Sequence, residues 1–146
     1  MDDELITRWN ETVRPTDTVY HLGDFTLSSK RRALQYLEKL NGTIKLVPGG
    51  HDGWIKNLMD TRKVKILPPL VTIEYSNQDD YPLVIVLCHY PLRSWDRSNY
   101  GAWHLHGHSH GNMKDEYNSL DIGVDTQNFY PVSIEELKTY FSLKTP

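Results

Sequence analysis

Residue types that bind divalent cations gather in four short stretches of the chain. These stretches are Gly23-Asp24, Gly50-His51-Asp52, Cys88-His89 and Gly107-His108-Ser109-His110. They follow apolar runs, so their polar side chains come where a strand is expected to end. Hard and borderline divalent ions prefer fixed carboxylate oxygens and imidazole nitrogens as ligands. The combination therefore predicts a site for two metal ions at an open rim of the fold.

Each stretch has a simpler interpretation when it is taken alone. A Gly-Asp pair after a strand is usually a turn, and a single histidine such as His89 is often a hydrogen-bonded residue of the core. Cys88 is expected to be a small buried apolar residue rather than a ligand. The pair His108 and His110 is more specific, because alternation on an extended segment directs both imidazoles to one side. The prediction therefore depends on the whole set.

The remaining histidines before these stretches are interpreted as supporting residues. His104 and His106 have the same parity as the His-x-His pair, so an unbroken strand would place four imidazoles on one face. We expect Gly107 to break this strand. His104 and His106 are therefore predicted to be strand residues or partners of the ligands. His21 lies within an expected strand and is interpreted in the same way.

Periodicity and cap residues predict the elements that must position these side chains. Helices are expected to begin at Asp2 or Asp3, at Ser28 or Ser29, near Trp54 and, with the capping box Ser133-x-x-Glu136, near residue 134. Strands are expected at residues 18–22, 43–47, 64–66, 70–75, 83–88, 103–106 and 120–124. The nearly uniform apolar run 83–88 indicates a strand that is covered on both faces. This alternation of strands and helices predicts an α/β fold.

Composition bounds the class of protein. The 146 residues, 38% of them hydrophobic, suit one domain over residues 1–146. A net charge of -3 provides no broad basic field, so extended nucleic acid is not an expected partner. There is one cysteine and no apolar segment that resembles a signal peptide or a membrane span. No membrane partner is expected, and a cytoplasmic location is predicted.

The four stretches in their order resemble the calcineurin-like metallophosphoesterase family, in particular its small single-domain bacterial and phage-type members. The motifs of that family run Asp-x-His, Gly-Asp, Gly-Asn-His-Asp, His and Gly-His-x-His, and this chain carries counterparts of the last four in that order. The resemblance covers nearly the whole chain. It implies a β-sheet sandwich flanked by helices, with the site on loops at strand ends.

The resemblance also implies which residues bind metal. Asp24 would bridge two divalent ions of manganese, nickel, zinc or iron. His89 and His108 would bind one of these ions, and His110 would bind the other. A hydroxide that bridges the two ions would attack the phosphorus of a phosphomonoester or phosphodiester. The implied substrate is a small phosphoester or a nucleotide.

Other residues are expected to act on the substrate. His51, oriented by Asp52, would be a general acid or a positive partner of the phosphoryl oxygens. Arg93 and Arg97 follow His89 and are candidates for binding a phosphate oxygen. Trp95 could stack on a nucleobase. The alternative for this segment is a solvated rim with one packed indole.

Two departures from the family pattern leave alternatives open. No Asp-x-His precedes Gly23, so the N-terminal strand of the family is expected to be missing and one ion keeps only Asp24 and His110. Gly50 stands where the family has an asparagine ligand, which leaves three protein ligands for the other ion. The chain is then either truncated or a degenerate relative.

These departures support two other functions. One is a catalytically impaired member that binds metal, a nucleotide or a protein partner. The other is a nuclease accessory component, which the acidic net charge makes less expected. A missing strand would also leave an exposed sheet edge. Because such an edge can pair with a second copy of the chain, a homo-oligomer is the alternative to a monomer.

Overall fold

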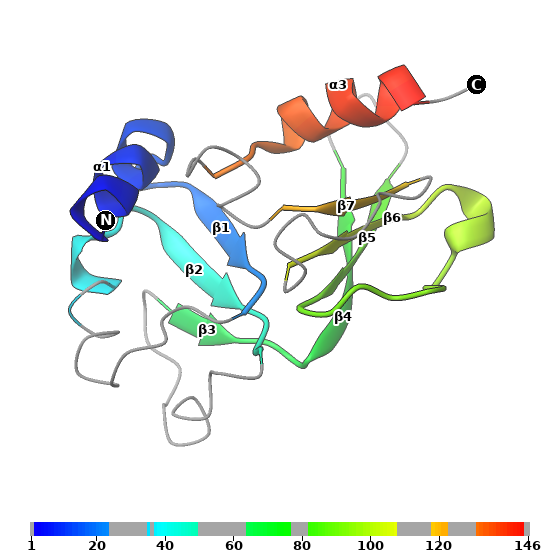
Figure 1. Ribbon diagram of the computed structural model, residues 1–146, viewed down its shortest axis with the longest axis horizontal. Coiled ribbons are helices and arrows are strands. Elements are labelled where there is room, and N and C mark those ends of the chain that lie inside the picture. The colour runs from blue at the N-terminus through cyan, green and yellow to red at the C-terminus, as the bar shows by residue number, and fades with distance from the viewer. Residues whose placement is uncertain are drawn as a thin grey trace.

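The computed structural model describes residues 2–23, 35, 37–49, 64–76, 82–107, 118–122 and 131–144. Two sheets stand side by side, with α1 against the first and α3 across the second (Figure 1). The first sheet has the order β1-β2-β3, and the second has the order β4-β5-β6-β7. This arrangement confirms the predicted α/β class.

The first sheet is parallel. Its strands are β1 (Thr18–His21), β2 (Thr43–Leu46) and β3 (Val64–Ile66). Alternation along the central strand β2 buries Ile44 and Leu46 almost completely. Because all three strands run the same way, their carboxyl ends lie at one edge of the sheet.

Helix α1 (Asp2–Thr12) covers this sheet through an apolar face. Trp9 and the following Val13 are buried against Ile44 and against Leu37 and Leu40. Residues 37–39 are helical, as expected for part of the second predicted helix. The packing fixes where β2 begins relative to the end of α1.

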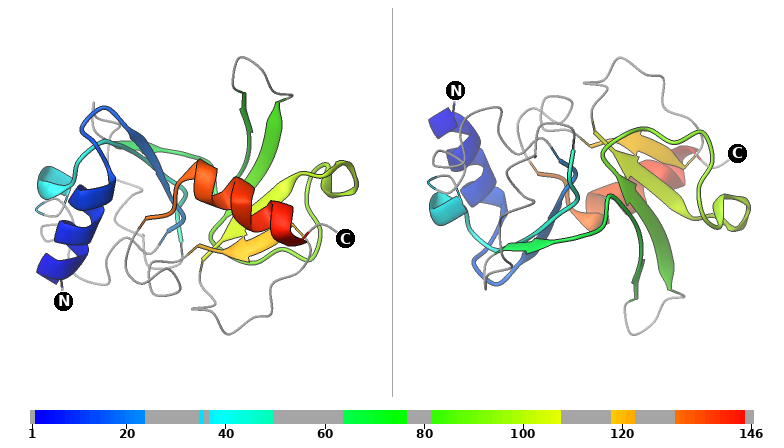
Figure 2. Two further views of the ribbon diagram at one scale, coloured as in Figure 1. Left: turned by 90° about the horizontal axis from the view of Figure 1, so that it is seen from above. Right: turned by 90° about the horizontal axis from the view of Figure 1, so that it is seen from below.

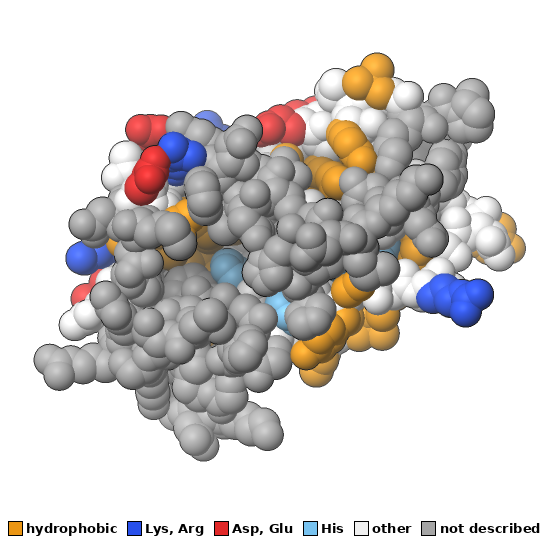
Figure 3. Space-filling view, in the orientation of Figure 1, with side chains coloured by type: hydrophobic (Ala, Val, Ile, Leu, Met, Phe, Trp, Pro, Cys, Tyr) orange, Lys and Arg blue, Asp and Glu red, His pale blue; other side chains and the backbone are white. Residues whose placement is uncertain are grey.

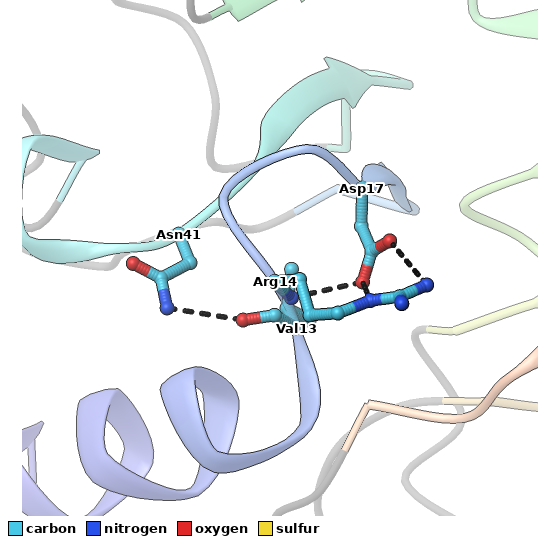
Figure 4. Close-up of polar contacts among 4 residues, drawn as sticks. All are labelled: Val13, Arg14, Asp17 and Asn41. Atoms are coloured by element: carbon cyan, nitrogen blue, oxygen red, sulfur yellow. Dashed lines mark hydrogen bonds and ion pairs between the residues drawn. The ribbon is translucent and has the colours of Figure 1, made fainter.

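Polar contacts complete this docking. The Asn41 side chain donates a hydrogen bond to the carbonyl oxygen of Val13 at 3.0 Å (Figure 4). The indole nitrogen of Trp9 donates to the carbonyl oxygen of Asn41 at 2.9 Å. Next to this contact, hydrogen bonds from the backbone and side chain of Arg14 hold the pKa of Asp17 below its usual value. The end of α1 is thereby attached to the turn before β2.

The second sheet is mixed. Its strands are β4 (Leu70–Tyr75), β5 (Leu83–Cys88), β6 (Trp103–His106) and β7 (Ser119–Asp121). β5 is antiparallel to β4 and parallel to β6, and β6 is parallel to β7. β5 and β6 are interior strands, which agrees with the buried apolar run predicted for residues 83–88.

Alternation along β6 separates an apolar face from a polar one. Trp103 and Leu105 belong to the main core, and the ring of Trp103 lies 4.4 Å from that of Phe141 in α3 (Ile134–Lys144). His104 and His106 alternate with these residues and are also buried, with their rings 5.2 Å apart. Figure 2 shows that α3 lies across one face of this sheet.

The capping box at the start of α3 is confirmed. The backbone N–H of Glu136 donates to the hydroxyl of Ser133 at 3.1 Å, and the N–H of Ser133 donates to the Glu136 carboxylate at 3.4 Å. These bonds satisfy two backbone donors at the helix terminus. Leu137 and Phe141 then face the sheet and are buried.

Several boundaries differ from the prediction. β1 and β2 each end one residue early, and β7 begins one residue early, at Ser119. A 3-10 helix at Ser98–Tyr100 (η2) was not predicted. β7 ends at Asp121, before the expected end at residue 124. The helix start expected at residues 28–29, the short helix expected at 54–59 and residues 123–124 lie outside the described residues. Within the ranges that are described, no helix combines the length and apolarity that crossing a bilayer requires.

Candidate metal centre

The carboxyl ends of four strands meet at one place. Gly23, which follows β1, has a φ of +97°, and a Cβ atom on it would lie 2.6 Å from the backbone nitrogen of Gly49 and 2.8 Å from Nδ1 of His89. The backbone N–H of Gly107, which follows β6, donates to the carbonyl oxygen of His89 at 3.0 Å. Gly23, Gly49, His89 and Gly107 therefore form a junction between the two sheets, called the strand-end junction below.

Glycine is required at Gly23 for two reasons. Its positive φ is a conformation that side-chain-bearing residues adopt at a cost, and there is no space for a Cβ atom. At Gly107 a Cβ atom would be 3.8 Å from Nδ1 of His89 and from the carbonyl oxygen of Leu22, which is ordinary contact. The tightest point of the junction is thus between Gly23 and Gly49.

His89 lies at the centre of this junction and is 3% exposed. Its Nδ1 atom is 2.6 Å from the carbonyl oxygen of Leu22. Because a carbonyl oxygen only accepts hydrogen bonds, Nδ1 carries the proton of the neutral ring. The lone pair is then on Nε2, and a hydrogen bond from the other ring nitrogen to a carbonyl is the usual support of a metal-binding histidine. The tautomer of His89 therefore fits a metal ligand.

Three of the predicted site residues, His89, Arg93 and Arg97, lie in the described part of the chain. Asp24, His51, Asp52, His108 and His110, together with Gly50, lie outside the described residues. Within the described ranges, no three His, Cys, Asp or Glu side chains are grouped closely enough to hold a metal ion. The structure describes residues that come shortly before three of them: Gly23 precedes Asp24, Gly107 precedes His108, and Gly49 lies two residues before His51.

His104 is a strand residue with both ring nitrogens in use. Nδ1 lies 3.1 Å from the carbonyl oxygen of Val86, and Nε2 accepts the backbone N–H of Leu92 at 2.9 Å. The side chain is fully buried. Burial lowers the pKa of His104 to about 4, with the neighbouring His106 adding to the shift. His104 is thus neutral near pH 7, which agrees with its interpretation as a strand or supporting residue.

The other supporting histidines lie near the same edge. Nδ1 of His106 is 3.2 Å from the carbonyl oxygen of Gly107, and Nδ1 of His21 accepts the N–H of Gly23 at 3.2 Å. Each imidazole therefore contacts the backbone beside a predicted ligand. Figure 3 shows histidine atoms near the middle of the face that it draws.

Asp121 is a feature that the sequence analysis missed. It is 3% exposed and lies directly opposite His106 in the register of β6 and β7. Paired residues on neighbouring strands project to the same side of a sheet, so the carboxylate shares the polar face with His106. A charged residue inside the apolar run 120–124 was the signal that could have identified it.

The segment after His89 has a packed indole. The ring of Trp95 lies 5.2 Å from that of His104, and its indole nitrogen donates to the carbonyl oxygen of Ala102 at 2.9 Å. Arg97 is exposed and ion-paired with Glu74 of β4 at 3.1 Å. Arg93 is also exposed, and it makes no ion pair with another described residue. Of these two candidate arginines, Arg97 is therefore the one that an ion pair holds within the described part of the chain.

Comparison with known proteins identifies a relative. The chain is 34% identical over 144 residues to Uncharacterized protein MJ1445 of Methanocaldococcus jannaschii, with 92% of this chain and 72% of the relative covered. The chain belongs to the MJ1445 family. A crystal structure of a protein of unknown function from Aquifex aeolicus, AQ665, resembles this MJ1445-family chain with a TM-score of 0.67 and 21% identity. That likeness covers 95% of this chain and 84% of the other, and it shows a shared fold.

A scan against family models gives no match. The comparisons therefore establish membership of the MJ1445 family and the fold. The chemistry of the strand-end junction has to be inferred from its residues.

Proposed function

We propose that this chain is a metal-dependent phosphoester hydrolase. The observation that carries the proposal is the strand-end junction, where Gly23, Gly49, His89 and Gly107 meet. Consecutive Cα atoms are about 3.8 Å apart. Asp24 and His108 follow the junction by one residue, and His51 follows it by two. This closeness along the chain supports the proposal that these residues share one site.

The metal ligands in this proposal are Asp24, His89, His108 and His110, which would hold two divalent ions. Carboxylate and imidazole donors suit manganese, nickel, zinc and iron, and the tautomer of His89 fits this role. When bound, such ions lower the pKa of water and neutralise negative charge on phosphoryl oxygens. The resemblance to calcineurin-like metallophosphoesterases supports the same set and a sandwich of the two sheets.

The remaining roles belong to residues of the chain itself. His51 donates a proton to the leaving oxygen or stabilises the phosphoryl oxygens, and Asp52 orients it. Arg93 contacts a non-bridging phosphate oxygen, since it is exposed and four residues beyond His89. Arg97 is a weaker candidate because Glu74 holds it. The substrate is a small phosphoester or nucleotide, because the net charge of -3 does not favour a polynucleotide. The proposed location is the cytoplasm.

Activity with added metal tests the proposal. The protein is incubated with manganese, and separately with nickel or zinc, and hydrolysis of bis-p-nitrophenyl phosphate is measured. His51→Ala and His108→Ala should lose at least roughly 100-fold in kcat. Arg14→Ala is the control, since this exposed residue lies on the turn after α1. Absence of hydrolysis with every metal, or equal rates in all variants, would show that the proposal is wrong.

Gly50 favours one rival function. An asparagine ligand is absent there, so the chain could be a silent member that binds one ion without turnover. Metal analysis separates the two functions. Two ions per chain with turnover support the hydrolase, and one ion without turnover supports the silent binding protein.

A further inference from the structure

We propose that His104 is a positioning residue that holds the segment after His89 in place for substrate binding. The inference rests on the proposed function and assigns a role to a histidine that is not expected to bind metal. It depends on the two hydrogen bonds of one buried imidazole and on where their partners lie in the chain.

The two ring nitrogens of His104 contact different parts of the fold. Nδ1 faces the carbonyl oxygen of Val86, which lies on the neighbouring strand β5. Nε2 accepts the backbone N–H of Leu92, which lies in the segment that leaves β5 after His89. The ring therefore bridges the centre of the sheet and a segment that has no strand pairing of its own.

This bridge requires a neutral ring. Since the carbonyl oxygen of Val86 only accepts, Nδ1 carries the proton and Nε2 is left as an acceptor for Leu92. A protonated ring would have no acceptor for the Leu92 N–H. Full burial favours the neutral form, and the pKa of His104 is lowered to about 4. The contact with Leu92 is therefore maintained throughout the neutral range.

The position of Leu92 in the chain links its contact with His104 to Arg93. Leu92 is three residues beyond His89 and directly precedes Arg93. The His89 end of the segment is held by the strand-end junction, and Trp95 packs on the His104 ring on the other side of Arg93. The backbone around Arg93 is thus fixed on both sides. A fixed backbone reduces the conformational entropy that a substrate-binding arginine loses when it orders on an anion.

Two substitutions separate the two hydrogen bonds. Asparagine at position 104 has its amide where Nδ1 stands, so His104→Asn can keep the bond to Val86 and loses the bond from Leu92. Glutamine has its amide near the position of Nε2, so His104→Gln can keep the acceptor for Leu92 and loses the bond to Val86. The two variants are matched, because both bury an uncharged amide.

The first measurement is hydrogen exchange of the Leu92 amide, which does not depend on activity. We expect exchange roughly tenfold faster in His104→Asn than in the wild type and nearly unchanged exchange in His104→Gln. The second is hydrolysis of bis-p-nitrophenyl phosphate with manganese. We expect KM to rise roughly five- to tenfold in His104→Asn, with kcat within about twofold, and both to stay near wild type in His104→Gln.

The outcomes distinguish the inference from the function on which it rests. Equal Leu92 exchange in both variants, or a larger KM effect in His104→Gln, would mean that His104 only joins two strands, and the inference would be wrong. A wild-type protein that hydrolyses nothing would overturn the proposed function, and the inference with it, before any variant is compared. A KM rise confined to His104→Asn, with faster Leu92 exchange, supports both.

Discussion

The imidazole of His89 joins the second sheet to the first, because its Nδ1 atom lies 2.6 Å from the carbonyl oxygen of Leu22. Leu22 directly follows β1, and His89 directly follows β5. One side chain therefore connects the carboxyl ends of strands that are distant in sequence. The structural and the proposed metal-binding roles of His89 belong to different ring nitrogens, so they can be separated by mutation.

The first prediction separates these two roles. His89→Asn keeps an amide donor near the position of Nδ1 and removes Nε2. We expect this variant to fold and to lose roughly tenfold or more in manganese affinity, measured by isothermal titration calorimetry. His89→Leu, which removes both nitrogens, should lose stability as well. Unchanged manganese affinity in His89→Asn would remove His89 from the metal site.

The second prediction concerns the tight approach at Gly23. Gly23→Ala and Gly101→Ala both place a Cβ atom at a positive φ, of +97° and +87°. That strain costs roughly 1–2 kcal/mol. At Gly23 the new atom also overlaps Gly49 and His89, which should cost roughly a further 1–3 kcal/mol. At Gly101 it would meet no described atom within 4 Å.

Urea unfolding followed by circular dichroism provides the comparison. We expect Gly23→Ala to have a clearly lower unfolding midpoint than Gly101→Ala. Equal losses in the two variants would mean that the strand-end junction is looser than this structure indicates.

The third prediction is a pH dependence of stability due to His104. Its pKa is about 4 in the folded chain and 6.5 in its ordinary state. Between these values the unfolded chain binds a proton that the folded chain does not. The stabilisation is therefore complete above pH 6.5 and is lost as the pH falls toward 4.

His104→Gln provides the control, because glutamine does not titrate. Between pH 7.5 and pH 4.5, the wild type should lose roughly 2–3 kcal/mol more of its free energy of unfolding than His104→Gln. Urea unfolding at the two pH values measures this difference. Equal losses of unfolding free energy in both proteins would show that protonation of His104 does not destabilise the fold.

The fourth prediction concerns the attachment of α1. Asn41→Asp replaces the donor to Val13 by a second acceptor, which should cost roughly 1–3 kcal/mol. Arg14→Ala, on the adjacent turn, should change stability little, because the Arg14 side chain is 82% exposed. Thermal unfolding of the two variants tests the contrast. A larger loss in Arg14→Ala would contradict the role given to Asn41.

The elements with strong local patterns could be predicted from the sequence. The apolar run 83–88 gave β5 within its observed bounds, and Ser133 with Glu136 gave the start of α3. Strand ends were displaced by a residue at β1, β2 and β7 because pairing with a neighbour, rather than local composition, decides where a strand stops.

Long-range features could not be predicted from local patterns. The short connection over residues 76–82 is compatible only with the antiparallel pairing of β4 and β5, but the parallel pairing of β6 with β5 is set by tertiary packing. Arg97 adopts a left-handed conformation, with a φ of 58°, although glycine and asparagine are the residues that usually signal it. The sequence indicated His104 as a strand or supporting residue, but its bond to Leu92 depends on a fold-level contact.

The tip formed by Tyr100 and Gly101 has a practical consequence. Tyr100 is 89% exposed, and a side chain at Gly101 would meet open space among the described residues. The single cysteine of the chain, Cys88, is buried. A thiol introduced by Tyr100→Cys would consequently be the preferred target of a maleimide dye, which provides a selective point for attaching a fluorophore or a surface linker.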